Sequence, residues 1–311
     1  MKRILILTDK LKYSCGVTTY IYNLIKYSDP NKTEFVLIGV MGDRVTDFIE
    51  LGISVYTYDS FEYYKRSIFR VFKNAFLICK ISIKYKIDII HSQNYYLANI
   101  SRISQKIIQK KTVQTIHNKF PKGRLRQFYA DKYIIVNKDL RTFAIKEFNI
   151  ADNDIYEIEC GLPIEKRIKE KSSEYLKIIV VSRLMKEKGV EVFIKAVSLL
   201  NDELKKKCSF YIAGEGDEEQ KLRRLNLQLN SGIQFLGIVK DTNDLFNSAH
   251  VFVIPSYWEM EGFPITIVEA ALSKNLIIAS DFRGLDSYLN NNDGFIFQKK
   301  DSNPLLMVFY C

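Results

Sequence analysis

The chain has 311 residues, 47% of them hydrophobic, which is enough apolar content for two α/β domains that each bury a core. Its five cysteines are odd in number and lie far apart, which indicates a reduced compartment. They also lack the paired spacing of a zinc site, so no metal is predicted. The N-terminal apolar run is too short for a signal peptide, and no run of about 18 apolar residues without a charge occurs, so we expect a cytoplasmic protein.

The net charge of +10 is concentrated in the first half of the chain. Residues 1–165 hold 26 Lys and Arg against 17 Asp and Glu, a difference of +9, whereas residues 166–311 hold 20 against 19, or +1. Most of the excess falls in residues 61–130, where the only acids are Glu62 and Asp88. This segment is interpreted either as a lysine-rich solvated surface or as a dock for an anionic membrane surface. We expect no nucleic-acid partner, because neither zinc-finger spacing nor an RNA-binding signature occurs.

Short β-branched runs alternate with longer amphipathic segments along the chain, the pattern of parallel sheets with crossover helices. In the first half, strands are predicted at 3–8, 34–39, 88–91, 112–117 and 132–136, and helices at 18–27, 68–85 and 97–109. These elements predict one doubly wound domain over residues 1–163, which we expect to hold the acceptor.

A charged, serine-containing stretch at residues 164–177 is interpreted as a linker. The alternating pattern then restarts and predicts a second Rossmann-like domain over residues 178–311. Its strands are expected at 178–182, 209–213, 234–236, 251–255 and 276–280, and its helices at 190–200, 218–230, 242–248 and 264–274. Because such sheets bind ligands beyond the carboxyl ends of their strands, we expect the active site in a cleft between the two domains.

Two cations stand in the loop after the first strand of the second domain. Arg183 directly follows the strand, and Lys188 shortly precedes the helix that starts at Val190. A guanidinium binds phosphate oxygens in pairs, an ammonium adds a point charge, and the amides of a helix N-terminus add more, so the loop suits a diphosphate. The alternative is that both side chains are merely solvated.

Two carboxylates flank the start of the helix predicted at 264–274. Glu261 precedes this helix, Pro264 takes its first position, and Glu269 lies in its second turn. A carboxylate accepts hydrogen bonds from two vicinal hydroxyls, which a sugar ring and a ribose both offer. The alternative is a helix-capping Glu261 and a surface Glu269. The helix is expected to end before Asn275, which tolerates the left-handed conformation.

Six short segments of the second half occur in an order typical of one enzyme family. They are Arg183-Leu184, Lys188-Gly189, Gly214 to Asp217, Phe235 to Gly237, Pro255-Ser256, and Glu261 to Pro264 continuing to Glu269-Ala270. Over about 120 residues this series resembles the family 4 retaining glycosyltransferases of the GT-B fold and includes that family's E-x7-E element.

The resemblance implies a donor site without metal or cofactor, in which the nucleotide sugar is a substrate linked to UDP or GDP. Arg183 and Lys188 would bind its diphosphate, Glu261 would contact the transferred sugar, and Glu269 would bind the ribose hydroxyls. The donor-binding residues implied in this way are Gly16, Arg183, Lys188, Glu261, Gly262, Phe263 and Glu269.

The first half resembles the family more faintly. Gly16, ahead of a helix, would let a loop close on the donor phosphates, although a single glycine there is also typical of a plain turn. His117 matches the family's histidine near the reacting sugar and joins Glu261, Arg183 and Lys188 as a catalytic candidate; the alternative is a strand-end histidine of structural role. His91 is interpreted as structural.

Three departures from the family pattern bear on activity. Cys160-Gly161 replaces a common Asn-Gly pair, and Ser287 stands where a glutamate is usual. The chain also stops soon after Gly294, with an apolar tail in place of the family's final helix, so we expect a truncated product with reduced activity.

Together these features predict a retaining, metal-independent hexosyltransferase that passes a sugar from a nucleoside-diphosphate donor to a saccharide or lipid-linked acceptor in surface polysaccharide biosynthesis. It would work in the cytoplasm, peripherally on the plasma membrane. Two alternatives remain open, a catalytically impaired remnant that still binds nucleotide sugar and a related nucleotide-sugar epimerase. A dinucleotide oxidoreductase fits less well, because no full G-x-G-x-x-G run occurs.

Overall fold

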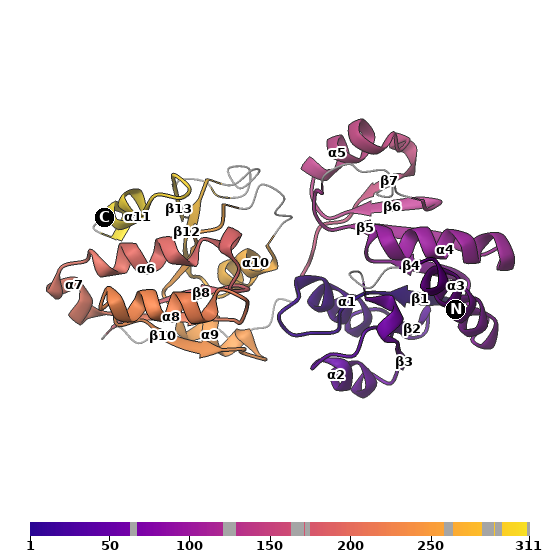
Figure 1. The fold of residues 1–311 in the computed structure, drawn as a ribbon, viewed down its shortest axis with the longest axis horizontal. Helices are drawn as coiled ribbons and strands as arrows, with labels where there is room; N and C mark the ends of the chain where they lie inside the picture. The colour runs from indigo at the N-terminus through magenta and orange to yellow at the C-terminus, as the bar shows by residue number, and fades with distance from the viewer. Residues whose placement is uncertain are drawn as a thin grey trace. The chain divides into compact units, whose positions relative to one another are not determined.

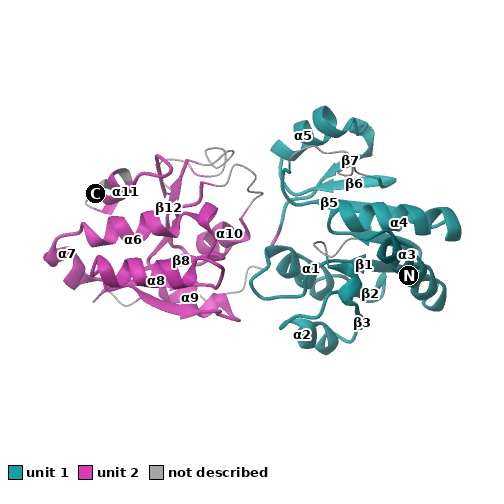
Figure 2. Cartoon of the chain, viewed as in Figure 1, with its two compact units in different colours: residues 1–160 teal, residues 161–311 magenta. Residues whose placement is uncertain are grey.

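The computed structural model describes residues 1–62, 67–120, 129–162, 171, 175–257, 264–281, 289 and 294–309. The chain divides into two compact units, residues 1–160 and 161–311, coloured separately in Figure 2. Each unit is built on one parallel sheet with helices along the crossovers (Figure 1), so the predicted fold class of two Rossmann-like domains is confirmed. Most of the predicted linker at residues 164–177 lies outside the described residues.

Unit 1 holds a seven-stranded sheet in the order β3-β2-β1-β4-β5-β6-β7. Its strands are β1 (Lys2–Leu7), β2 (Thr33–Gly39), β3 (Ser54–Thr57), β4 (Ile89–Ser92), β5 (Lys111–Ile116), β6 (Lys132–Ile135) and β7 (Ile155–Glu157). Its α-helices are α1 (Gly16–Lys26), α2 (Val45–Glu50), α3 (Ile68–Lys84), α4 (Tyr95–Ile108) and α5 (Asp139–Phe148). The strand order reverses between β1 and β4, and a doubly wound sheet binds ligands at the carboxyl ends of the strands at such a point.

Both faces of the sheet in unit 1 are covered, which is why its central strands are apolar at successive positions. Along β1, Leu5 and Leu7 pack into the cluster formed with α3 and α4, whereas Ile6 points to the opposite face. There it contacts the cluster of Ile21 and Ile25 from α1. The alternation follows from the two-residue period of a strand.

Unit 2 repeats this winding with the sheet order β10-β9-β8-β11-β12-β13. Its strands are β8 (Leu176–Val181), β9 (Cys208–Ala213), β10 (Gln234–Gly237), β11 (Val251–Ile254), β12 (Leu276–Ser280) and β13 (Gly294–Phe297). Its α-helices are α6 (Val190–Ser198), α7 (Asp202–Lys207), α8 (Glu219–Gln228), α9 (Thr242–Ser248), α10 (Ile265–Leu272) and α11 (Ser302–Phe309). The order reverses between β8 and β11, so the carboxyl ends of those two strands mark the equivalent ligand-binding position.

Two details at the ends of α10 differ from the prediction. The helix begins at Ile265, so Pro264 occupies the N-cap with an extended backbone (φ −69°, ψ 117°) and not the first helical position. At the other end Lys274, with φ 52°, adopts the left-handed conformation that was assigned to Asn275. Asn275 is buried instead, and its side-chain amide donates to the carbonyl oxygens of Phe246 and Ala249. The asparagine therefore joins α10 to α9.

No helix in the described part of the chain is long and apolar enough to cross a membrane.

Candidate functional site

The loop after β8, residues 182–189, is bonded to the loops of both neighbouring strands. On the β9 side, the Leu184 amide donates to the Glu215 carbonyl oxygen (2.8 Å), and the Glu218 amide donates to the Leu184 carbonyl oxygen (3.0 Å). On the β11 side, the Tyr257 amide donates to the Glu187 carbonyl oxygen (2.9 Å). The loop is thus held from both sides at the point where the strand order of unit 2 reverses.

Two glycines permit these close approaches. Gly189 ends the loop with φ 64°, and a Cβ there would lie 2.0 Å from the Pro255 carbonyl oxygen. Gly214, with φ 132°, would bring a Cβ within 1.9 Å of the Ser182 carbonyl oxygen. Both positions need a backbone conformation that side chains oppose and a space that a methyl group would fill.

Replacing Gly189 by alanine is expected to destabilise unit 2 by about 2–4 kcal/mol, since the change combines a left-handed backbone with a steric clash. Gly232→Ala is the matched control: Gly232 has φ 71°, but no described atom lies within 4 Å of its Cβ position. That variant should lose only about 1 kcal/mol. Urea unfolding followed by the fluorescence of Trp258, the single tryptophan, measures both. Equal losses would contradict the packing argument.

The structure places both predicted phosphate-binding cations on this loop. Arg183 is half-buried, and half-buried Lys188 ends a short 3-10 turn, Lys186–Lys188, before α6. Lys186, in the same turn, is exposed. The positive end of the α6 dipole adds to the two side-chain charges, so the arrangement favours a dianionic group at this position.

Glu269 lies in α10, where its carboxylate accepts a hydrogen bond from the Thr242 hydroxyl (2.5 Å). Thr242 is the first residue of α9, so Glu269 joins the start of one helix to the middle of another. The donor-site candidates Glu261, Gly262 and Phe263 lie outside the described residues, and their roles remain predictions.

In unit 1, His117 directly follows β5 and belongs to a polar cluster at the reversal point of that sheet. Its Nε2 lies 2.8 Å from Oε1 of Gln93, which follows β4, and its ring meets the edge of the Tyr20 ring at 4.9 Å between centroids. Gln93 is buried, and its Nε2 has no hydrogen-bond partner among the described residues. With this amide orientation, His117 Nε2 donates and its Nδ1 can accept.

Burial keeps both histidines of unit 1 neutral. It lowers the pKa of His91 to about 4, and burial together with the neighbouring His91 lowers the pKa of His117 to about 3. His91 is fully enclosed and pairs with the Thr115 hydroxyl at 2.8 Å, which supports its structural interpretation. His117 keeps part of its surface accessible. It can therefore exchange hydrogen bonds with a ligand but does not supply a cation at neutral pH.

Asp9 belongs to the same edge and was missed in the sequence. It follows β1, and burial raises the pKa of its carboxyl group, opposed mainly by the charge of Lys10. The run Thr8-Asp9-Lys10 directly after an apolar strand was the available signal, because charged residues at the end of a central strand lie at the ligand-binding edge of the sheet. Gln93, the partner of His117, carried no comparable signal.

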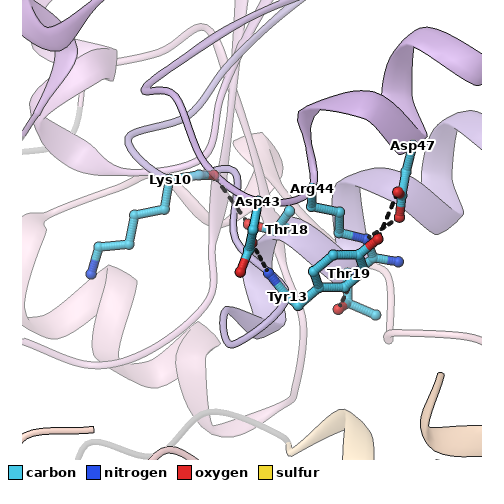
Figure 3. A network of polar contacts seen from close by, with 7 residues as sticks. All are labelled: Lys10, Tyr13, Thr18, Thr19, Asp43, Arg44 and Asp47. Carbon is cyan, nitrogen blue, oxygen red and sulfur yellow. Dashed lines mark hydrogen bonds and ion pairs between the residues drawn. The ribbon is translucent and has the colours of Figure 1, made fainter. Parts of the chain in front are cut away.

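The loop between β1 and α1 is held by a network drawn in Figure 3. The Tyr13 amide donates to the Asp43 carboxylate (2.9 Å), and the Tyr13 hydroxyl donates to the Asp47 carboxylate (2.7 Å). Burial and this second bond raise the pKa of Tyr13 to about 12. Arg44 completes the network by donating to the Thr19 hydroxyl (2.8 Å) and pairing with Asp47 (3.3 Å). The loop is thereby fixed against the segment that follows β2.

Gly16 is exposed and forms the first residue of α1. No described atom lies within 4 Å of its Cβ position, and its φ is not positive. Neither packing among the described residues nor backbone conformation therefore requires glycine here.

Among the described residues, no group of three His, Cys, Asp or Glu side chains could hold a metal ion.

Two family models match the chain. The model described as Glycosyltransferase Family 4 matches residues 15–166, and the model described as Glycosyl transferases group 1 matches residues 163–306. The first match covers most of unit 1 and the second most of unit 2.

Several proteins have similar sequences. The N,N'-diacetylbacillosaminyl-diphospho-undecaprenol alpha-1,3-N-acetylgalactosaminyltransferase of Campylobacter jejuni is 25% identical over 330 residues, covering 93% of this chain and 85% of that protein. The UDP-Gal:alpha-D-GlcNAc-diphosphoundecaprenol alpha-1,3-galactosyltransferase of Escherichia coli is 24% identical, covering 77% and 70%. An uncharacterised glycosyltransferase of Methanocaldococcus jannaschii is 31% identical over 194 residues, and the chain spans about half of its length (48%).

Solved structures with the same fold cover the whole chain. Anabaena HepE in complex with UDP-glucose has a TM-score of 0.83 at 17% identity, and 89% of its chain is covered. A glycosyltransferase from Rickettsia africae has a TM-score of 0.80 at 22% identity, with 88% covered. At these identities the likeness shows the fold.

Proposed function

We propose a reaction for this chain from the family to which it belongs: it is a member of the family 4, or group 1, glycosyltransferases with the GT-B fold. The chain transfers a hexosyl group from a nucleoside-diphosphate sugar to a saccharide or lipid-linked acceptor, retaining the anomeric configuration and using no metal. Unit 2 binds the donor, and unit 1 binds the acceptor. The observation that carries this proposal is the loop at residues 182–189, which holds Arg183 and Lys188 in place at the reversal point of unit 2.

In this reaction the bond between the sugar C1 and the diphosphate oxygen breaks, the acceptor hydroxyl oxygen bonds to C1 on the same face, and the hydroxyl proton passes to the departing diphosphate. Negative charge builds on the departing diphosphate, so groups that stabilise this charge lower the barrier. Arg183 binds the phosphate oxygens, and Lys188 with the start of α6 stabilises the developing charge. The backbone of the loop is bonded to the loops on both sides, so little reorganisation is needed during the reaction.

Glu269 binds the ribose hydroxyls in this proposal, with Thr242 fixing its rotamer through their hydrogen bond. Glu261, Gly262 and Phe263 take the transferred sugar. In unit 1, neutral His117 exchanges a hydrogen bond with a sugar hydroxyl, oriented by Gln93, and Gly16 leaves room for a phosphate group at the start of α1. A neutral imidazole serves this purpose without repelling a cationic transition state.

The acceptor is a lipid-linked saccharide of surface polysaccharide biosynthesis. Two relatives that cover most of this chain are named for acceptors linked to undecaprenol through a diphosphate. The excess of basic residues in the first half complements such an acceptor and the anionic membrane that carries it. The chain therefore works peripherally on the cytoplasmic face of the plasma membrane.

Calorimetric titration with UDP and GDP tests the donor site. The wild-type chain is expected to bind UDP, and Arg183→Ala should bind it about 1–3 kcal/mol more weakly, because a charge-assisted contact to phosphate is lost. Arg224→Ala is the control, since Arg224 is exposed on α8 and donates to the Gln220 carbonyl oxygen of its own helix. Tighter binding of GDP than of UDP would change the expected base of the donor nucleotide but leave the assignment of the donor site intact. Absence of binding to either nucleotide by a folded chain would refute the proposal.

A further inference from the structure

The outer face of α3 exposes a row of large apolar side chains. Phe69, Phe72, Phe76 and Ile83 are 84%, 61%, 68% and 67% exposed. They are separated by three, four and seven residues, so they lie on one side of the helix. Soluble proteins rarely expose several neighbouring aromatic side chains unless another surface covers them.

The opposite face of α3 is firmly attached to unit 1, so the apolar row cannot turn inward. The buried Asn74 side chain exchanges two hydrogen bonds with Ser60, at 2.6 and 2.8 Å. The Ser104 hydroxyl of α4 donates to the Ala75 carbonyl oxygen (3.1 Å), and Ile78 is fully buried beside them. The two helices lie next to each other in Figure 1. Exposure of the row is therefore a fixed property of the fold.

Cations border the apolar row. Lys73 and Lys80 are exposed and seven residues apart. Each comes four positions after an aromatic residue of the row, Phe69 or Phe76, so it lies on the same side of the helix. Lys84 continues their line at the end of the helix. Neither α3 nor α4 contains an acidic residue. The partner of this face must therefore accept aromatic rings and provide negative charge.

We propose that the outer face of α3, defined by Phe69, Phe72, Phe76 and Ile83 with Lys73 and Lys80, docks unit 1 on an anionic lipid bilayer. The helix lies in the plane of the membrane surface, its rings enter the boundary between headgroups and acyl chains, and its lysines meet the lipid phosphates. A second copy of the chain fits less well, because its own row of lysines would face the first. This inference names the membrane surface on which the proposed function depends.

Flotation with vesicles tests the docking face on the full chain. The wild type is expected to bind vesicles of phosphatidylcholine mixed with phosphatidylglycerol at low salt, and to bind phosphatidylcholine alone or high-salt samples weakly. The double variant Phe72→Gln with Phe76→Gln should lower the partition coefficient about tenfold or more, because both rings lose their apolar contact. The double variant Lys73→Gln with Lys80→Gln should lower the partition coefficient about 25-fold, because each lysine contributes a factor of about five.

Matched controls change the same kinds of residue in unit 2. Leu199→Gln with Leu227→Gln removes two exposed apolar side chains, and Lys195→Gln with Lys206→Gln removes two exposed charges. Both should bind vesicles as the wild type does. Circular dichroism and thermal unfolding verify that every variant is folded, since all substituted side chains are exposed.

Three results would overturn the proposal. They are a wild type that does not float with anionic vesicles, α3 variants that float as well as their controls, and a dimer in sedimentation experiments that the Phe72 and Phe76 substitutions abolish. UDP binding is measured on the same variants. Because none of the proposed donor-site residues lies on α3, a chain that floats but binds no nucleotide would refute the transferase proposal alone.

Discussion

Lys188→Ala is expected to lower kcat for release of the nucleoside diphosphate from its sugar about 10²–10³-fold, the loss that follows removal of one preorganised group at a developing negative charge. Lys188 ends a turn in the loop whose backbone is bonded to the loops after β9 and β11, and in the proposed function its ammonium meets the charge that grows on the leaving group. The effect should fall on kcat more than on the affinity for donor, because the charge of the diphosphate grows only as the bond to C1 breaks.

Lys186→Ala provides the comparison for that experiment. Lys186 belongs to the same turn and carries the same charge, but its side chain is exposed to solvent. Its removal should change kcat by less than about threefold, since exposed charges are screened by water and salt. Release of nucleoside diphosphate from the donor that calorimetry identifies measures both variants. Equal losses would indicate a general electrostatic effect of the turn and remove the specific role of Lys188.

Acidification from pH 7 to pH 5 is expected to destabilise unit 1 by about 2–4 kcal/mol. The folded chain holds His91 and His117 neutral, with pKa values of about 4 and about 3, whereas both titrate near 6.5 when unfolded. The unfolded state therefore binds more protons below pH 6.5, and stability falls as the pH decreases at about 1.4 kcal/mol per pH unit for each histidine. Asp9 acts in the opposite direction, because burial raises its pKa and the folded state takes up its proton first.

His117→Gln separates the contribution of one histidine, since glutamine can still hydrogen-bond to Gln93 but does not ionise. This variant should lose about half as much stability between pH 7 and pH 5. His250→Gln removes the third histidine of the chain, which lies in unit 2, and should leave the acid response of unit 1 as in the wild type. Hydrogen exchange at the amides of β4 and β5, measured against urea at both pH values, gives the free energies. If His117→Gln lost as much stability between pH 7 and pH 5 as the wild type does, the assignment of half of that loss to His117 would be wrong.

Most of the fold could be predicted because its core strands are short apolar runs between amphipathic helices. β9, β10 and β12 fall within a residue or so of the prediction, and the predicted range of α9 is correct. The missed elements are mostly short or polar. β3 is a half-buried edge strand of four residues. β7 is an edge strand of three residues, of which Tyr156 and Glu157 are exposed. Their positions depend on a neighbouring strand and not on a local pattern.

The candidate site was predicted unevenly. Arg183 and Lys188 lie in a loop whose motif is local, and the structure has both residues between β8 and α6, where the sequence predicted a loop. The partnership of His117 with Gln93 joins residues 24 positions apart through adjacent strands, and only the register of the sheet brings them together. The contact between Glu269 and Thr242 likewise depends on how two helices pack. Local patterns therefore identified residue types, whereas tertiary packing decided their partners.

The central position of the first strand in each sheet also affects how the protein folds. β1 pairs with β4, but Ile89 comes 82 positions after Leu7 (89 − 7 = 82), so one edge of β1 stays unpaired until β4 emerges from the ribosome. At roughly 5–20 residues per second this takes roughly 4–16 seconds. Unit 2 repeats the situation with β8 and β11. Each domain thus folds slowly through non-local pairing and exposes an apolar strand edge until the partner strand has been synthesised.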